Sequence, residues 1–189
     1  MEDVHDSGFR LLFIYGSDMH PEQIKQRCPL AEPLFVARLP GHRLDFFGQI
    51  SRWDSGEETV FASPGEDVWG VVYKLDFGSA EELDAWQDVR LDGTGKHFHF
   101  PVTVQDAKGN AYPALTYKRS DSGTPMLPSK EYLDYLTGAA SKRGLPIAYI
   151  EQLAARAAKK AAYPVPKSLR YTPVVLADPC AACEQAGQE

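Results

Sequence analysis

The sequence contains few cysteines and no excess of positive charge. Its three cysteines, Cys28, Cys180 and Cys183, do not make a disulfide framework, so we expect a reducing, cytoplasmic location. The formal net charge is −6 and the sequence pI is near 5.4. Because binding to phosphates requires a basic surface, this charge argues against nucleic acid as the main partner.

Long apolar runs are also absent. The longest have the length of a buried strand and fall far short of the roughly 20 residues of a membrane span. The first ten residues are acidic and lack the apolar stretch of a secretory signal, so we expect neither export nor a membrane partner. The remaining composition, 43% hydrophobic and 24% charged residues, is typical of one globular domain with its own core.

Strand-like patterns dominate the first two thirds of the chain. The apolar run at residues 9–15 ends at Gly16 and Ser17, as a buried strand does before a tight loop. Residues 68–75 form the most strand-like stretch, and Gly70 within it predicts a close approach of another backbone. Further strands are expected at residues 34–39, 43–47, 59–62, 96–104 and 111–118, with a polar loop at residues 53–58.

Helical patterns cluster later in the chain. Ser79 followed by Glu82 is typical of a capping box and predicts a helix over residues 80–87. Ser129 begins a second helix that ends near residue 144, and a third is expected from about residue 145 to 160. A short helix is also expected at residues 21–27, after Pro21.

This order of elements predicts an α+β fold, with helices packed outside a mixed, curved or barrel-like sheet. We assign residues 1–160 to this domain. Residues 161–189 include four prolines and end in polar residues, so we expect an extended or partly disordered tail.

Six stretches resemble the γ-glutamylcyclotransferase-like (AIG2-like) family in their order and spacing. They are FIYGSD at residues 13–18, the strands at 36–39 and 44–46, SPGEDVWGVVY at 63–73, LD at 83–84, PSKEY at 128–132, and GA with GLPIAY at 138–149. Together they cover roughly residues 11–155. The resemblance implies the fold of that family, a mixed β-barrel or curved sheet with peripheral helices.

The resemblance also implies an enzyme, and we expect it to need no cofactor or metal. Members of the family cyclise the γ-glutamyl group of a small molecule to 5-oxoproline and release an amine or amino acid. The α-amino group of the substrate attacks its own γ-carbonyl carbon, and it must first lose a proton to a base because an ammonium has no lone pair. The resemblance places substrate binding at four successive residues and at a pocket tyrosine: Tyr15, Gly16, Ser17, Asp18 and Tyr132.

The chain departs from the family pattern at this expected pocket. Gln87 stands where the family has its catalytic glutamate, and a carboxamide is not a usable base near neutral pH. Asp18 replaces an asparagine, which adds a negative charge beside the loop that is expected to bind a carboxylate. Asp88 replaces a glycine, and His97, a further candidate for substrate binding, replaces a tyrosine.

Two hypotheses follow from these departures. One is a cyclotransferase whose base has moved, with Asp18 and Asp88 as the candidates. The other is a divergent member without cyclotransferase activity, which binds a small molecule or catalyses a different reaction in the same pocket. The sequence does not decide between a monomer and a homodimer.

Two further motifs are weak signals. His97 and His99 alternate on one strand face, a spacing that metal ligands share, but a lone H-x-H motif more often marks ordinary polar positions, so no metal is expected. Cys180 and Cys183 form a C-x-x-C motif without the flanking elements of a redox or zinc site.

Overall fold

The computed structural model describes residues 8–121 and 123–167, and it shows the α+β architecture that the sequence predicts. Five strands close into a barrel in the order β1, β3, β2, β4, β5. The strands are β1 (Phe9–Ile14), β2 (Glu32–Ile50), β3 (Ser55–Asp76), β4 (His97–Gln105) and β5 (Ala111–Arg119). The helices are the 3₁₀ turn η1 (Ser17–Met19), α1 (Pro21–Arg27), α2 (Phe77–Trp86), α3 (Lys130–Lys142) and α4 (Ile147–Ala154).

The barrel closes through two short contacts. All neighbouring strands are antiparallel except β1 and β5, which are parallel and are paired at Leu12 and Leu115. Strands β2 and β4 are paired at Arg38 and Gln105. The Arg38 guanidinium also donates to the Gln105 side-chain oxygen at 2.7 Å, so side chains reinforce the seam where few backbone bonds form.

Strands β2 and β3 form one long hairpin, which the sequence patterns had divided. The strands expected at residues 34–39 and 43–47 belong to a single strand that passes through Gly41, a residue with a φ of 68°. The polar loop expected at residues 53–58 is confirmed only at residues 53–54, because β3 already begins at Ser55. Its two glutamates therefore lie on a strand, with Glu57 paired to Phe47 and Glu58 to Phe46.

The apolar run of β1 is continuous because both faces of the strand are buried. Phe13 and Tyr15 pack into one hydrophobic cluster, with Leu39 and Tyr132 among its members. Leu12 and Ile14, which alternate with them, belong to a second cluster that includes residues of α1, α2 and α3. Since successive side chains point to opposite faces, both faces of β1 are buried. Gly70 on β3 confirms the predicted close approach, because an added Cβ would lie 2.3 Å from the Ile14 carbonyl oxygen.

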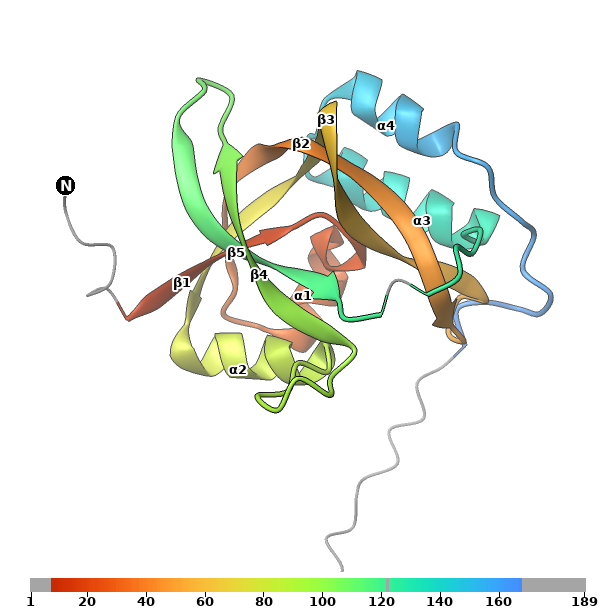
Figure 1. The fold of residues 1–189 in the computed structure, drawn as a ribbon, viewed down its shortest axis with the longest axis horizontal. Helices are drawn as coiled ribbons and strands as arrows, with labels where there is room; N and C mark the ends of the chain where they lie inside the picture. The colour runs from red at the N-terminus through yellow and green to blue at the C-terminus, as the bar shows by residue number, and fades with distance from the viewer. Residues whose placement is uncertain (1–7, 122, 168–189) are drawn as a thin grey trace, which may run out of the picture.

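The helices cover the barrel at two places. Figure 1 shows α3 and α4 beside the β2–β3 hairpin, while α2 lies at the other end of the barrel, near the start of β4. Helix α2 begins three residues earlier than expected because the Asp76 side chain, rather than Ser79, caps it by accepting from the Ser79 backbone N–H at 2.7 Å. Within the described residues, no helix combines the length and the apolar character of a membrane span.

The last helix also ends early, at Ala154 rather than near residue 160. The chain then runs back to the start of α3, where the Lys159 N–H donates to the Pro128 carbonyl. Residues 161–167 continue without helix or strand, and the Lys167 N–H donates to the Arg52 carbonyl at 2.8 Å. This part of the expected tail therefore packs on the barrel, whereas Cys180 and Cys183 lie outside the described residues.

Candidate functional site

One cavity of about 460 Å³ brings together every site residue that the sequence indicates. It lies where the loop after β1, the start of β3, the end of α2 and the start of β4 meet. The predicted residues that line it are Tyr15, Gly16, Ser17, Asp18, Gln87, Asp88, His97 and Tyr132. Two further lining residues, Glu57 and Glu58, were assigned by the sequence patterns to a polar loop.

Glu58 is the carboxyl group that the sequence does not indicate. It lies on β3 and is buried, with 8% of its surface exposed, and its carboxyl group reaches the loop after β1. Its Oε1 accepts the Ser17 backbone N–H at 2.9 Å, and its Oε2 accepts the Tyr132 hydroxyl at 2.6 Å. A carboxylate has about four lone-pair positions, so these two bonds orient the group and leave room for a third partner.

The environment of Glu58 changes its proton affinity. Burial is the main cause that raises the pKa of the Glu58 carboxyl to about 7; the nearby Glu57 carboxylate adds to the rise, and the hydrogen bond from Tyr132 opposes it. Burial and the Glu58 charge also raise the pKa of the Tyr132 phenol well above its ordinary value, so Tyr132 remains a hydrogen-bond donor. Glu58 thus titrates near neutrality, as a general acid/base must.

Gly16 allows Glu58 to reach the loop. A Cβ added at this position would lie 2.0 Å from Glu58 Oε1, closer than any real contact. The φ of Gly16 is −110°, which any residue adopts, so the space taken by Glu58 is what excludes a side chain there. Gly16, which is expected to contact a substrate, lines the cavity and also lies against a carboxyl group of the protein itself.

Asp18 and Gln87 form a hydrogen-bonded pair in the cavity wall. Asp18 is 3% exposed, and its Oδ1 accepts bonds from Arg27 at 2.8 Å and Gln23 at 2.9 Å. Its Oδ2 accepts from the Gln87 amide nitrogen at 2.7 Å. The negative charge of Asp18 is therefore paired, and its two oxygens are occupied by positioned donors. Gln87 keeps a second amide N–H for another partner.

Asp88, the other aspartate considered as a relocated base, forms an ion pair with Arg90. Its Oδ1 accepts from the Arg90 guanidinium at 2.8 Å, and this bond is the main cause that lowers the pKa of the Asp88 carboxyl. Arg90 and Asp88 are both partly exposed, at 58% and 33% of their side-chain surfaces. A carboxyl with a lowered pKa is a weak proton acceptor near neutral pH.

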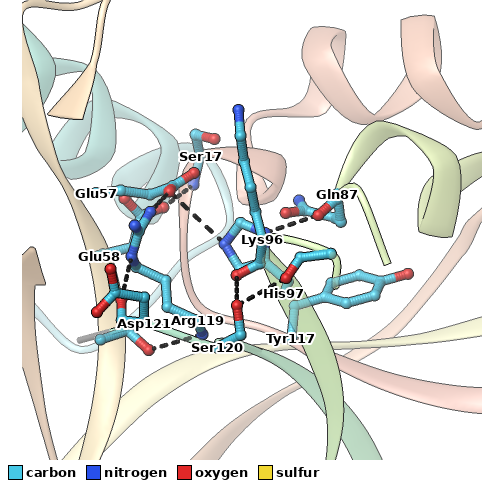
Figure 2. Close-up of polar contacts among 12 residues, drawn as sticks. Ser17, Glu57, Glu58, Gln87, Lys96, His97, Tyr117, Arg119, Ser120 and Asp121 are labelled. Atoms are coloured by element: carbon cyan, nitrogen blue, oxygen red, sulfur yellow. Dashed lines mark hydrogen bonds and ion pairs between the residues drawn. The ribbon is translucent and has the colours of Figure 1, made fainter. Parts of the chain in front are cut away.

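His97 spans the cavity between two of its walls. Its Nδ1 lies 2.7 Å from the Gln87 carbonyl oxygen, and because a carbonyl only accepts, this nitrogen carries the hydrogen. Its Nε2 lies 3.7 Å from Glu57 Oε2, and Glu57 is bound to the Arg119 guanidinium. Figure 2 shows His97 between Gln87 on one side and Ser17, Glu57 and Glu58 on the other.

Two remaining candidates from the sequence, Tyr15 and His99, make hydrogen bonds within the fold. Tyr15 lines the cavity, but its hydroxyl donates to the Tyr117 carbonyl at 2.7 Å and its ring belongs to the core. His99 bonds Asp84 at 2.7 Å rather than facing the cavity with His97. In residues 8–121 and 123–167, no group of three or more His, Cys, Asp or Glu residues is arranged to hold a metal ion.

Comparison with known proteins agrees with this geometry. The model of the AIG2-like family matches residues 67–153. The γ-glutamylcyclotransferases of Bos taurus and Homo sapiens are each 34% identical to the chain, over 147 and 149 residues. These matches cover 76% and 77% of both partners. The chain belongs to the γ-glutamylcyclotransferase family.

A solved structure supports this assignment. A γ-glutamyl cyclotransferase superposes with a TM-score of 0.76 at 31% identity, over 83% of this chain and 93% of that protein. The γ-glutamylcyclotransferases are enzymes, and their fold is the barrel with peripheral helices seen here.

Within this γ-glutamylcyclotransferase fold, the acidic pair on β3 is what sequence reasoning missed. The only cue in the sequence is that Glu57 and Glu58 adjoin the apolar strand residue Val60 without an intervening turn residue. The pairing with β2 extends the strand through both glutamates and carries them to the cavity. A strand start that depends on a partner strand is not encoded in local composition.

Proposed function

We propose that this protein cyclises the γ-glutamyl group of a small molecule to 5-oxoproline and releases an amine or amino acid, with Glu58 as its acid/base. The observation that supports the proposal is the Glu58 carboxyl itself, which is buried in the cavity beside Gly16 and Ser17 with a pKa of about 7. A carboxyl group with that pKa accepts a proton from an ammonium near neutral pH and returns it in a later step. In a member of this family, the Glu58 carboxyl would then serve as the base, a role that the carboxamide of Gln87 cannot fill.

Each neighbour of Glu58 then has a part in the proposed reaction. The Ser17 N–H and the Tyr132 hydroxyl hold the carboxylate, so that a free lone pair faces the substrate α-ammonium. After proton transfer, the amine attacks the γ-carbonyl carbon and negative charge grows on the carbonyl oxygen. The second amide N–H of Gln87, whose first is fixed on Asp18, stabilises that oxygen.

The test is release of 5-oxoproline from a panel of γ-glutamyl amino acids and γ-glutamyl amines. We expect the wild-type protein to turn over at least one of them, and Glu58→Gln to lose about 10²–10⁴-fold in kcat because the amide cannot carry the proton. Asp18→Asn keeps an oxygen for Gln87 and should lose much less. Collapse in Asp18→Asn or Asp88→Gly, with Glu58→Gln active, would instead identify that aspartate as the relocated base.

A divergent member without this activity is the second candidate, and one observation favours it. The Ser17 N–H, which the family resemblance offers to the substrate, is already taken by Glu58. On this hypothesis Glu58 fills the substrate position instead of serving it. Wild-type protein would then release no 5-oxoproline from any member of the panel. The double substitution Glu58→Ala with Gln87→Glu would gain turnover, because it frees the Ser17 N–H and restores a carboxylate at position 87.

The location of the protein in the cell is also a proposal. We infer a cytoplasmic protein, because a count of three cysteines does not indicate a disulfide framework and, among the described residues, Cys28 is a buried free thiol. Fractionation of cells expressing the tagged full chain would test it, and recovery in a membrane or secreted fraction would contradict it.

A further inference from the structure

We propose that His97 is a second proton-transfer residue, whose Nε2 carries a proton from the attacking nitrogen to the leaving nitrogen of the substrate. This inference rests on the proposed cyclisation and divides its proton transfers between two side chains. Glu58 activates the α-amino group, and His97 serves the step in which the old C–N bond breaks. The leaving-group dependence of the rate distinguishes this role from a structural one.

His97 lies where it can reach a ligand in the cavity. It lies at the start of β4, is 8% exposed, and lines the same cavity as Ser17 and Glu58. Its ring is held by the backbone carbonyl of Gln87 at 2.7 Å. The imidazole thus sits against the residue that stands in place of the family glutamate. A side chain that can carry a proton thus lies next to the carboxamide that stands in place of the family glutamate.

The tautomer of the His97 imidazole is fixed by its hydrogen bond. The hydrogen on Nδ1 is committed to the Gln87 carbonyl, so in the neutral ring Nε2 has a free lone pair. The nearest acidic oxygen, Glu57 Oε2, is 3.7 Å from Nε2 and is too far for a hydrogen bond. Glu57 is itself bound to Arg119. Nε2 is therefore available to a ligand, whereas Nδ1 is not.

The charged groups around the ring are consistent with a transient imidazolium. Glu57 on β3 faces Nε2, and the exposed Lys96 precedes the histidine in the chain. Asp88 lines the cavity after α2, and Glu58 lies beyond Glu57 on β3. Figure 2 shows the Lys96 side chain extending away from the imidazole, while Glu57 is joined to it. An imidazolium formed during the reaction would face a carboxylate.

The proton balance requires two carriers or one that is used twice. The α-ammonium carries three protons and the lactam nitrogen of 5-oxoproline keeps one, so two must leave. Glu58 takes the first before attack. His97 Nε2 takes the second once the new C–N bond has formed, and gives it to the leaving nitrogen as the old C–N bond breaks. Glu58 then returns its proton to the released amine, which becomes an ammonium, and no net proton is exchanged.

The matched variant is His97→Asn, because its amide nitrogen lies near the position of Nδ1 and keeps a donor for the Gln87 carbonyl, while the side chain cannot carry a proton. We compare γ-glutamyl-alanine, whose alkylamine leaves only when protonated, with γ-glutamyl-p-nitroanilide, whose weakly basic amine leaves without help. We expect kcat for γ-glutamyl-alanine to fall about 10²-fold or more, and kcat for the p-nitroanilide to fall less than about tenfold.

The control is His99→Asn on the same strand, at a histidine bonded to Asp84 outside the cavity lining. This substitution should change kcat for both substrates by the same factor. In addition, imidazole in the buffer should raise the turnover of γ-glutamyl-alanine by His97→Gly, since it supplies the missing carrier to the space left by the ring.

The outcomes separate the two proposals. Equal losses of His97→Asn on both substrates, or no rescue of His97→Gly by imidazole, would overturn the role of His97 while leaving the cyclisation in place. Where the wild-type protein turns over γ-glutamyl-alanine but not the p-nitroanilide, the rescue experiment decides alone. Silence of the wild-type protein on the whole panel of γ-glutamyl compounds would overturn both.

Discussion

At the scale of single residues, the burial of Glu58 links proton binding to folding. Its pKa is about 7 in the folded protein and near 4.5 in an ordinary environment, so between these values the folded state binds more protons than the unfolded state. The free energy of unfolding therefore falls as the pH rises from 4.5 to 7, by about 3 kcal/mol at about 1.4 kcal/mol for each unit of pKa.

Urea unfolding of the wild type and of Glu58→Gln across this pH range measures the effect. The difference in free energy of unfolding between the two proteins should shift by about 3 kcal/mol in favour of the variant as the pH rises, since glutamine does not ionise. Parallel pH profiles of the two proteins would show that the pKa of Glu58 is the same in the folded and unfolded states, which would contradict a pKa raised by burial.

At the residue scale, the structure shows which predicted residues lie together, while their roles stay predictions. The Tyr15–Asp18 loop, Gln87, His97 and Tyr132 were placed in one pocket, and they line one cavity. Asp18 and Asp88 were candidates for the base because their types are acidic, but the sequence does not reveal that Arg27 and Arg90 bind them. Such pairings depend on side-chain positions across the fold.

At the scale of elements, the start of α3 positions the tyrosine that holds Glu58. Ser129 is fully buried at the N-cap, where its hydroxyl donates to the Trp53 carbonyl at 2.7 Å and accepts from the Tyr132 N–H at 3.2 Å. Ser129→Ala removes both bonds, so we expect the free energy of unfolding to fall by about 1–2 kcal/mol and kcat to fall because Tyr132 is less well fixed. Thermal unfolding and 5-oxoproline release measure the two effects.

Ser141→Ala is the control for this change, since Ser141 is exposed in the last turn of the same helix. It should leave stability within about 0.5 kcal/mol of the wild type. Equal small effects of both substitutions would mean that the helix start does not depend on its buried cap.

Element boundaries were predictable where the signal is local. The strand at residues 9–15 and the cap of α3 at Ser129 were both found from a few neighbouring residues. The start of β3 at Ser55 and the end of α4 at Ala154 were not. The first depends on pairing with β2, and after the second the chain leaves the helix to bond with Pro128 and Lys130.

At the scale of the whole molecule, the packed part of the chain extends beyond the domain boundary expected at residue 160. The Ala162 N–H donates to Asp54 at 2.8 Å, the Tyr163 hydroxyl to the Ser51 carbonyl at 2.6 Å, and the Lys167 N–H to Arg52. A chain that ends after residue 160 should therefore have a Tm lower by about 4 °C or more, because several hydrogen bonds are lost.

A chain that ends after residue 167 keeps these contacts and is the matched comparison. Differential scanning calorimetry of the two shortened chains beside the full protein measures the difference. If the shorter chain unfolds at the same temperature as the longer one, residues 161–167 rest on the barrel without stabilising it.

The proton carriers proposed here, Glu58 and His97, both belong to barrel strands, β3 and β4. A reaction centre built on a loop is lost on mild heating, when that loop opens locally while the rest stays folded. With its carriers in the barrel wall, this protein has no such early failure of its acid/base groups. Glu58 and His97 would then keep their places up to the temperature at which the barrel comes apart, and an earlier loss of activity on heating would come from Ser17 and Gln87, which lie outside the strands.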